Sequence, residues 1–305
     1  MNIAPVSTHE ERPAVGMAAA ISAFFMFSVM LVCAKLLSER HSAIEIAFYR
    51  NLIGCVPFLI TVFVFGRREI LVVQSKLSMI GLRAVFGAVS LVLTFTAFAL
   101  MPMADATTLL FTSTLFIPFL ALFFLKESVG LWRWLAVFTG FIGVLVMIRP
   151  GGEVNSLGVL VALSAAFVQA GMAILLRYLG RYESPETISF YFLVFGTLLT
   201  ALPLPFIAVT PTLQEWPLLV GVGLSGAAAQ WLLSIAFKHA RAASVTVFNY
   251  SSIIWSTLFG WLIWNDWPLP NVFMGAAIVI AANLVIVWRE SRRFRITGAR
   301  VQAKF

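Results

Sequence analysis

Residues 104–116 read ADATTLLFTSTLF and open a run, 106–125, that has no charged residue. The stretch carries five hydroxyl side chains: Thr107, Thr108, Thr112, Ser113 and Thr114. An apolar helix of about 20 residues is long enough to cross a bilayer. Hydroxyls on such a helix belong on a side that faces protein, where they form hydrogen bonds between helices. The stretch therefore predicts a membrane helix that packs inside a bundle.

The whole chain has the composition of a membrane protein. Of its 305 residues, 61% are hydrophobic and 11% are charged, whereas about 25% of the residues of a soluble domain are charged. The first apolar segment is too long for a cleaved signal peptide and lacks a basic flank, so we expect a retained helix. Ten segments are suited to span a lipid bilayer: 15–37, 44–65, 79–100, 106–125, 131–149, 157–178, 187–209, 217–237, 244–264 and 270–288.

The basic residues predict how the chain is oriented. Of 21 Lys and Arg, 16 fall in the N-terminal tail, every second connection and the C-terminal tail, and Lys35, Arg40 and Arg149 form the opposite set. Short basic loops stay in the cytoplasm, so we expect both termini on the cytoplasmic side of a bacterial-type inner membrane. The net charge of +8 is spread over these connections rather than gathered on one face, so no nucleic-acid partner is expected.

An internal repeat runs through the chain. Two shifts align it with itself: a shift of 139 pairs Gly87 with Gly226, Thr107 with Thr246 and Ser113 with Ser252, and a shift of 142 pairs Lys35 with Arg177, Ser42 with Ser184 and Phe48-Tyr49 with Phe190-Tyr191. Each copy, 15–150 and 157–288, holds five segments, and tails 1–14 and 289–305 flank them. Because five is odd, the second copy enters the membrane from the other side. The sequence thus predicts an all-α integral membrane protein of ten helices in a 5+5 inverted repeat, an architecture of secondary transporters.

Several motifs resemble those of a known family. They are AFALMPMADA (97–106), FTS (111–113), KE (126–127) and GFIGVLVMIRPG (140–151), with Lys35 and FYR (48–50) before them. Over residues 15–288 the chain resembles the EamA type of the drug/metabolite transporter superfamily. The resemblance implies a carrier in which the first four helices of each half enclose a cavity, while the fifth and tenth pack outside and support a homodimer. The chain departs from the family pattern at Thr114, where Pro is usual, and at Asp266, where Glu is usual.

Polar and aromatic side chains within the apolar segments are the substrate-binding candidates. They are Arg50, Thr108, Thr112, Gln169, Tyr191, Gln230, Trp231, Asn249, Tyr250 and Trp255. Thr108 and Thr112 share one helical face, and Asn249 and Tyr250 fall in the matching block of the second copy. For any single Ser or Thr, a bond to the carbonyl one turn back is the alternative interpretation.

Charged residues within the segments are candidates for a gate or for ion coupling: Lys35, Arg83, Asp105 and Arg177. A central charge costs about 2.5–3.5 kcal/mol on the insertion scale, which also favours a cavity or gate position for Arg50, about two turns inside its segment. Arg83, about one turn inside, is either a gate or snorkels to the interface. Lys35 and Arg177 are either paired gates or interfacial anchors. No carboxylate lies at a segment centre, so a rim group such as Glu45 or Asp105 would serve any coupling.

Enzyme, cofactor and metal signatures are missing from the sequence. It contains no His-Glu-x-x-His, no Gly-rich phosphate loop and no Gly-x-Ser-x-Gly, and its 2 Cys lie within apolar segments. A membrane-bound lipid enzyme and a channel stay as alternatives of a different class; a channel would pass its solute without saturation. We expect a small-molecule carrier that works by alternating access.

The substrate is predicted from the charges of the candidate set. Basic and neutral groups without a central carboxylate disfavour a simple cation and favour an aromatic or zwitterionic metabolite. Riboflavin, or a similar heterocycle, taken up by facilitated diffusion is the candidate that we name. Export of amino acids, drugs or other metabolites, and transport of S-adenosylmethionine, are the alternatives.

Overall fold

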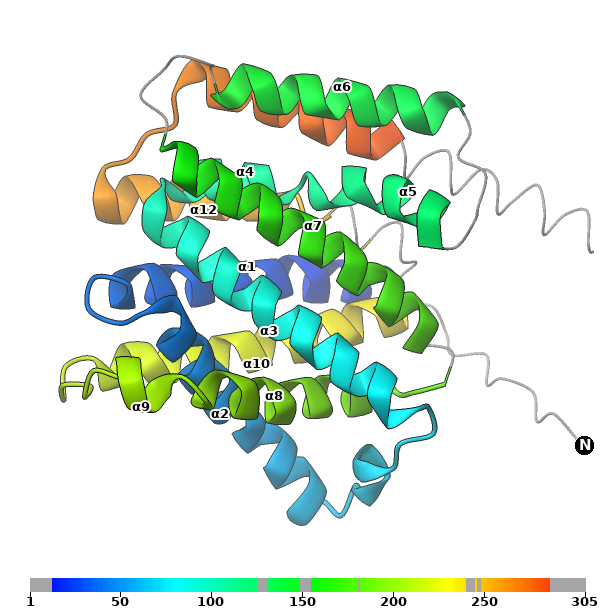
Figure 1. Ribbon diagram of the computed structural model, residues 1–305, viewed down its shortest axis with the longest axis vertical. Helices are drawn as coiled ribbons and strands as arrows, with labels where there is room; N and C mark the ends of the chain where they lie inside the picture. Colours follow the sequence, from blue (N-terminus) through cyan, green and yellow to red (C-terminus); the bar gives the residue numbers. More distant parts are fainter. Residues whose placement is uncertain are drawn as a thin grey trace, which may run out of the picture.

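The computed structural model describes residues 13–124, 131–148, 155–179, 182–239, 245 and 248–285. Over these residues the chain forms a bundle of helices joined by short connections (Figure 1), which confirms the predicted all-α architecture. The helices are α1 (Pro13–Leu37), α2 (Ala43–Phe63), the 3-10 helix η1 (Arg68–Leu71), α3 (Leu77–Leu100), α4 (Met103–Leu110), α5 (Ser113–Phe124), α6 (Leu131–Ile148), α7 (Ser156–Leu179), α8 (Pro185–Ala201), α9 (Leu204–Ile207), α10 (Trp216–His239) and α12 (Ser251–Trp264), followed by a last helix at Pro270–Val285.

Five of these helices are long and apolar enough to cross a membrane by length and composition. They lie within α1, α2, α3, α7 and α10. Shorter apolar helices at Met103–Ile117, Trp134–Ile148, Pro185–Ala201, Ser251–Trp264 and Pro270–Val285 occupy the other five predicted segments. The described part of the chain therefore contains helix in all ten segments.

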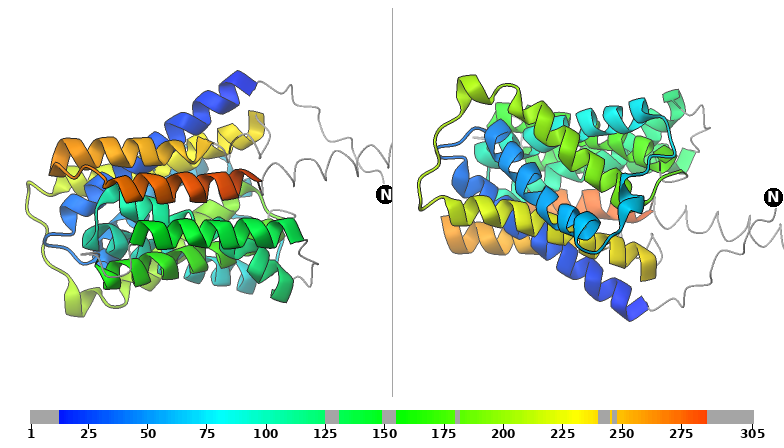
Figure 2. Two further views of the ribbon diagram at one scale, coloured as in Figure 1. Left: turned by 90° about the horizontal axis from the view of Figure 1, so that it is seen from above. Right: turned by 90° about the horizontal axis from the view of Figure 1, so that it is seen from below.

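The two repeats enter the bundle from opposite ends. α1 begins at the end where α2 finishes and η1 lies, whereas α7 begins at the other end, beside the end of α3 (Figures 1 and 2). There the Asn155 side-chain amide donates to the Leu100 carbonyl at 3.1 Å. We call the end where α1 begins the basic end, after the basic connections that the sequence gathers there, and the other the opposite end. The inversion predicted from the odd number of segments is confirmed.

Two segments are interrupted at equivalent positions. The fourth segment is divided into α4 and α5 at Phe111-Thr112, and the ninth turns at Asn249-Tyr250 before α12. The shift of 139 brings these two breaks to within one residue of each other. The sequence predicted 106–125 and 244–264 as spanning segments and did not place these breaks within them. Backbone groups freed at membrane depth are tolerated where they are buried in protein or line a cavity, so the breaks point to the centre of the bundle.

The second helix of each repeat begins with the same cap. The Ser42 hydroxyl accepts a hydrogen bond from the Glu45 amide at 3.2 Å, and the Ser184 hydroxyl accepts one from the Thr187 amide at 3.1 Å. An N-cap of this kind stabilises a helix by about 1 kcal/mol. The seventh segment is shorter than the expected 187–209, because α8 ends at Ala201 and the separate turn α9 follows Pro203.

α6 and the last helix lie side by side at one edge of the bundle (Figures 1 and 2), as the family resemblance implied. A Cβ atom on Gly275 would lie 2.5 Å from the Gly143 carbonyl oxygen, so the two backbones approach closely. The Asn271 side-chain amide also donates to the Met147 carbonyl at 2.8 Å. Small residues and interhelical hydrogen bonds are what hold helices together in lipid, and both are present here.

The remaining helices pair across the repeats. α1 packs on α10, α3 on α7 and α2 on α8. Because the repeat alignment matches α1 with α7 and α3 with α10, the first two pairs are equivalent. A large core cluster near the opposite end joins both repeats and includes Val32, Phe98, Met103, Leu109, Val159 and Val272. These contacts surround the centre of the bundle, where the helix breaks lie.

Candidate functional site

A cavity of about 450 Å³ lies between the two repeats, close to both helix breaks. Its walls come from α1 to α4 and the start of α5 in the first repeat, and from α7, α8, α10 and the segment around the second break in the second repeat. Sites for small molecules have volumes of about 300–1,000 Å³. Five of the sequence candidates line the cavity: Arg50, Arg83, Gln169, Gln230 and Asn249.

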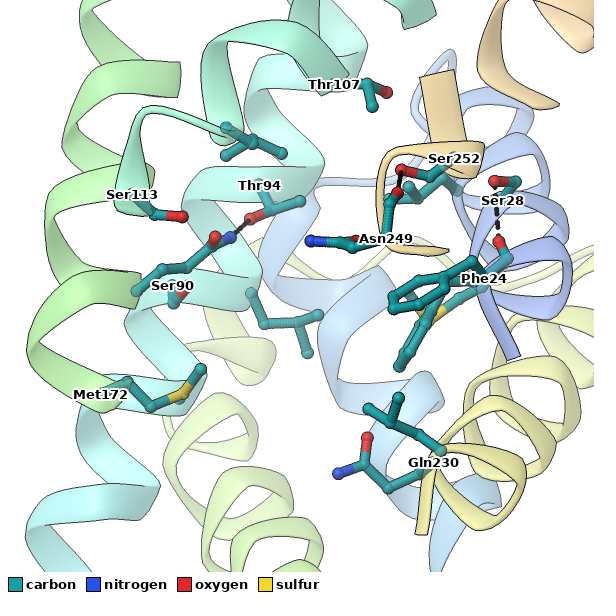
Figure 3. Close-up of a pocket in the computed structure, with 18 of the residues that line it drawn as sticks. Phe24, Ser28, Ser90, Thr94, Thr107, Ser113, Met172, Gln230, Asn249 and Ser252 are labelled. Carbon is teal, nitrogen blue, oxygen red and sulfur yellow. Dashed lines mark hydrogen bonds between the residues drawn. The ribbon is translucent and has the colours of Figure 1, made fainter. Parts of the chain in front are cut away.

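Neutral polar side chains face each other across the cavity (Figure 3). Asn249 extends from one wall, and Thr94 and Ser113 face it from the other. The Gln169 side-chain amide donates to the Thr94 hydroxyl at 3.3 Å. The Ser252 hydroxyl donates to the Asn249 carbonyl at 2.6 Å and so occupies a backbone group at the second break. The Asn249 amide itself points into the cavity.

Three of the five hydroxyls of the quoted stretch bond to backbone carbonyls in or beside the first break. They donate to carbonyls one turn back: Thr108 to Ala104 at 2.8 Å, Thr112 to Leu109 at 2.6 Å and Thr114 to Phe111 at 2.8 Å. The Thr114 hydroxyl also donates to the side-chain oxygen of Asn283 in the last helix. Only Thr107 and Ser113 of the five line the cavity. The structure thus leaves Thr108 and Thr112 outside the cavity lining and gives them the alternative role, which is to bond carbonyls near the break.

Four aromatic candidates also lie away from the cavity lining. The Tyr191 hydroxyl donates to the Leu71 carbonyl at 2.9 Å near the basic end. Trp231 is 65% exposed on α10. Tyr250 packs on Phe111 with ring centres 5.1 Å apart, and Trp255 meets Phe25 edge-on at 5.1 Å. Sequence alone does not tell which aromatic residues line the cavity, because an apolar helix carries aromatic side chains on its lipid-facing, helix-facing and cavity-facing sides alike.

Arg50 is buried in α2 and reaches the cavity. Its Nη1 donates to the Asn51 side-chain oxygen at 3.0 Å, and its Cζ lies 5.5 Å from the ring centre of Phe192. On α10, Gly226 leaves room for the guanidinium, because a Cβ atom there would lie 3.0 Å from the Arg50 Nε.

Arg83 approaches the same ring from the other end of the bundle. It lies about 9 Å along α3 from Leu77 at 1.5 Å per residue, is buried, and places its Cζ 4.4 Å from the Phe192 ring centre. The snorkelling interpretation of Arg83 is therefore wrong. A Cβ atom on Gly87 would lie 2.4 Å from the Arg83 Nη1 and 2.6 Å from Phe192, so glycine is needed where the side chain crosses its own helix.

Phe192 is one of the cavity residues that sequence reasoning missed. It lies on α8 and contacts both arginines. The signal was available, because the shift of 142 that aligns Phe48-Tyr49 with Phe190-Tyr191 also aligns Arg50 with Phe192. Thr107 was likewise marked by its alignment with Thr246.

Of the remaining gate candidates, Lys35 has the clearest contacts. Its Nζ donates to the Met101 carbonyl at 2.8 Å and lies 5.0 Å from the ring centre of Trp264. It therefore ties α1 to the ends of α3 and α12 at the opposite end. Asp105 lies in the first turn of α4 at that end. Arg177 is on α7, but its side chain lies outside the described residues, as does Glu127.

A polar tie joins the repeats at the opposite end. The His41 Nδ1 lies 2.9 Å from Glu45 Oε1, and its Nε2 lies 3.3 Å from Glu215 Oε2, in the connection before α10. The Arg40 Nη1 lies 2.9 Å from Glu215 Oε1. The backbone amide of Thr212 is the largest cause that lowers the pKa of Glu215 to about 2, and its side chain, His41 and Arg40 lower it further. Glu215 is thus an anion in this tie at neutral pH.

An equivalent tie lies at the basic end. Glu183 Oε1 accepts hydrogen bonds from the backbone amides of Gln74, at 2.8 Å, and of Ser75, in the connection before α3. The shift of 142 aligns Glu183 with His41. Each repeat therefore uses the same position, just before its second helix, to reach the connection before the third helix of the other repeat.

Acidic groups are missing from the described cavity lining. Among the described residues there is also no group of three or more His, Cys, Asp or Glu that could hold a metal ion.

The fold and the cavity define a class of protein, an inverted-repeat membrane protein with a solute-sized chamber between its halves. Comparison with known families is consistent with this class. Residues 14–149 and residues 156–288 each match the EamA-like transporter family. The chain belongs to this family, and it is a multi-pass membrane transporter of a small molecule rather than an enzyme.

Named relatives cover most of the chain. The pseudopaline exporter CntI of Pseudomonas aeruginosa is 31% identical over 89% of this chain and 95% of its own length. A riboflavin transporter of Brucella anthropi is 31% identical over 90% and 98%, and an S-adenosylmethionine uptake transporter of Rickettsia bellii is 28% identical over 86% and 89%. A solved crystal structure, 19% identical, has the same fold with a TM-score of 0.64 over 92% of this chain and 98% of its own.

Proposed function

We propose that this protein carries a small metabolite with a planar ring across the membrane by alternating access, and that the central cavity is its substrate site. One observation carries the proposal: the two inverted repeats share the cavity close to the break in the fourth helix of each. In inverted-repeat transporters, substrates bind between the repeats where helices are discontinuous.

The ties at the two ends of the bundle support alternating access. His41 contacts Glu215 at one end, and Glu183 bonds to the connection before α3 at the other. Opening the cavity toward either side separates the repeats at that side and breaks the tie there. Both ties are formed in this structure, and in the proposed cycle each would break when the cavity opens at its end.

Riboflavin is the substrate that we propose to test first. Phe24, Phe98 and Phe111 supply aromatic faces in the cavity, close to the amides of Gln169 and Asn249. Aromatic rings attract planar ligands, and a few well-placed polar groups orient them. A simple cation is disfavoured, because the described lining has two arginines and no acidic residue.

The names of the relatives support uptake of riboflavin as one candidate. They keep S-adenosylmethionine uptake and metabolite export as alternatives. We further propose that both termini face the cytoplasm, that residues 15–150 and 157–288 are the two functional halves, and that α6 and the last helix support a homodimer.

Uptake in a strain unable to make riboflavin tests the substrate. Expression should raise the uptake of labelled riboflavin, the uptake should saturate, and unlabelled riboflavin inside vesicles should accelerate it by counterflow. Unchanged uptake would reject riboflavin, and saturable counterflow of another metabolite would still support a carrier. Flux that rises without saturation would instead indicate a channel.

A further inference from the structure

The cavity has an unbalanced positive charge. Arg50 is 5% exposed and Arg83 is 4% exposed, and both guanidinium groups contact Phe192. No Asp or Glu of the described chain forms an ion pair with either of them. A charge inside the membrane is costly and is kept where it pairs with a partner or serves a function.

Several donors of the two arginines lack an acceptor. Nε of Arg50 and both Nε and Nη1 of Arg83 are buried and have no hydrogen-bond partner among the described residues. Apart from the aromatic ring, the contact with Asn51 is the hydrogen bond that the described structure gives these groups. An arginine presents five donors in a rigid fork that matches a carboxylate or a phosphate.

The backbone is shaped to hold both guanidinium groups. Gly87 makes room for Arg83, and Gly226 makes room for Arg50. These two glycines align under the shift of 139, so equivalent positions of the two repeats make room for Arg83 and Arg50, both of which belong to the first repeat. Such an arrangement places the two guanidinium groups at one point of the cavity wall, 5.5 Å and 4.4 Å from the centre of the Phe192 ring.

We infer that the carried molecule has an acidic group, a carboxylate or a phosphate, and that Arg50 and Arg83 bind this group beside Phe192. The inference rests on the proposed function, because it assigns the acid to the substrate of the same cavity. The planar part of the molecule then lies toward Asn249 and Gln169. Neutral riboflavin lacks the acid and riboflavin 5′-phosphate has it. Under this inference an acidic ring compound such as the phosphate therefore replaces riboflavin as the expected substrate, and the proposed carrier function is unchanged.

Matched pairs of probes test the acid directly. The melting temperature of the purified full-length protein is measured with riboflavin and riboflavin 5′-phosphate, with indole-3-propionamide and indole-3-propionate, and with benzamide and benzoate. A ligand that binds only the folded state raises the melting temperature. We expect the acidic member of at least one pair to bind about tenfold more tightly, which corresponds to about 1.4 kcal/mol. If no acidic member stabilises the protein more than its neutral partner, the inference is wrong.

Variants locate the acid-binding group. Arg83→Gln and Arg50→Gln should each reduce the preference for the acidic member about tenfold, and Arg83→Lys should keep part of it, because the charge stays while the fork is lost. Arg67→Gln is the matched control, since Arg67 is an exposed arginine beside Glu69 outside the cavity. A preference that survives both cavity substitutions would overturn the assignment. The comparison of probe pairs on the unaltered protein does not depend on whether a variant folds.

Counterflow in vesicles separates this inference from the proposed function. A preference for acidic probes without saturable exchange would reject the carrier and leave the acid site in place. Saturable exchange of a neutral compound, unaffected by Arg83→Gln, would support the carrier and reject the acid site.

Discussion

Arg50 of the first repeat and Phe192 of the second occupy equivalent positions and lie against each other, with the Arg50 Cζ 5.5 Å from the ring centre. Equivalent residues of an inverted repeat meet where the two halves are related by symmetry. With Phe192 at the second position, the Arg50 guanidinium packs on an aromatic ring rather than on an arginine of the other repeat. The difference between the repeats therefore supplies a positive charge together with the ring that supports it.

Asn249→Ala should weaken transport and leave the amount of protein in the membrane near normal. The amide points into the cavity (Figure 3), and a hydrogen bond to a ligand contributes about 0.5–1.5 kcal/mol, or about twofold to tenfold in transport at low substrate. Initial uptake rates and membrane abundance measure the two effects. Thr139→Ala removes a polar group from the exposed face of α6 and should change neither. Loss of the protein from the membrane would show instead that Asn249 is structural.

Gly87→Ala should lower substrate affinity. The added methyl group would lie 2.4 Å from the Arg83 Nη1 and 2.6 Å from Phe192, so both side chains must move. Gly81→Ala adds the same methyl group to the same helix with nothing within 4 Å, which makes it the matched control. Half-saturation concentrations for transport should rise for the first variant alone. Equal values for the two variants would contradict the placement of Arg83 over Phe192.

Gly275→Ala should destabilise the pair formed by α6 and the last helix. The new Cβ atom meets the Gly143 backbone carbonyl, which has no rotamer that gives way. Overpacking of this kind costs about 1–3 kcal/mol, and the thermal unfolding of the protein in detergent measures it. Gly81→Ala is again the reference. An unchanged melting temperature would show that the contact between α6 and the last helix contributes little to the stability of the folded protein.

The tie at the opposite end should weaken in acid. The pKa of Glu215 is lowered from 4.5 to about 2, so its contribution to stability is fully present above about pH 4.5 and is lost as the pH falls toward 2. Glu215→Gln should remove this part of the acid-induced loss of stability and leave the rest. Glu39→Gln, a substitution of an exposed residue on the same connection as His41, is the control. A pH profile that is identical for wild type and Glu215→Gln would contradict the tie.

Labelling of single cysteines tests the orientation of the chain. In a Cys33→Ala, Cys55→Ala background, a membrane-impermeant maleimide should label Glu39→Cys in intact cells. It should label Glu69→Cys, whose native side chain is 67% exposed, only after the membrane is opened. The expectation follows from the basic connections at the end where η1 lies. The reverse pattern would place both termini outside.

Composition and the length of the apolar runs identified the ten segments, since a helix satisfies its own backbone in lipid and needs about 20 residues to cross it. They did not reveal the breaks at Phe111-Thr112 and Asn249-Tyr250. A break inside an apolar run is stabilised by distant groups such as Asn283, which bonds to Thr114 of the first break from the last helix. No local signal in the run specifies that partner.

The sequence by itself determined the all-α membrane class, the inverted repeat and the cavity roles open to Arg50 and Asn249, because charge, amide groups and repetition are visible without a fold. The tertiary structure decided which side each polar group faces. It turned Thr108 and Thr112 to nearby backbone carbonyls and brought Phe192 against two arginines. It also tied His41 to the second repeat at one end and Glu183 to the first repeat at the other. These outcomes depend on contacts between residues far apart in the chain, and such contacts arise only when the two halves pack together.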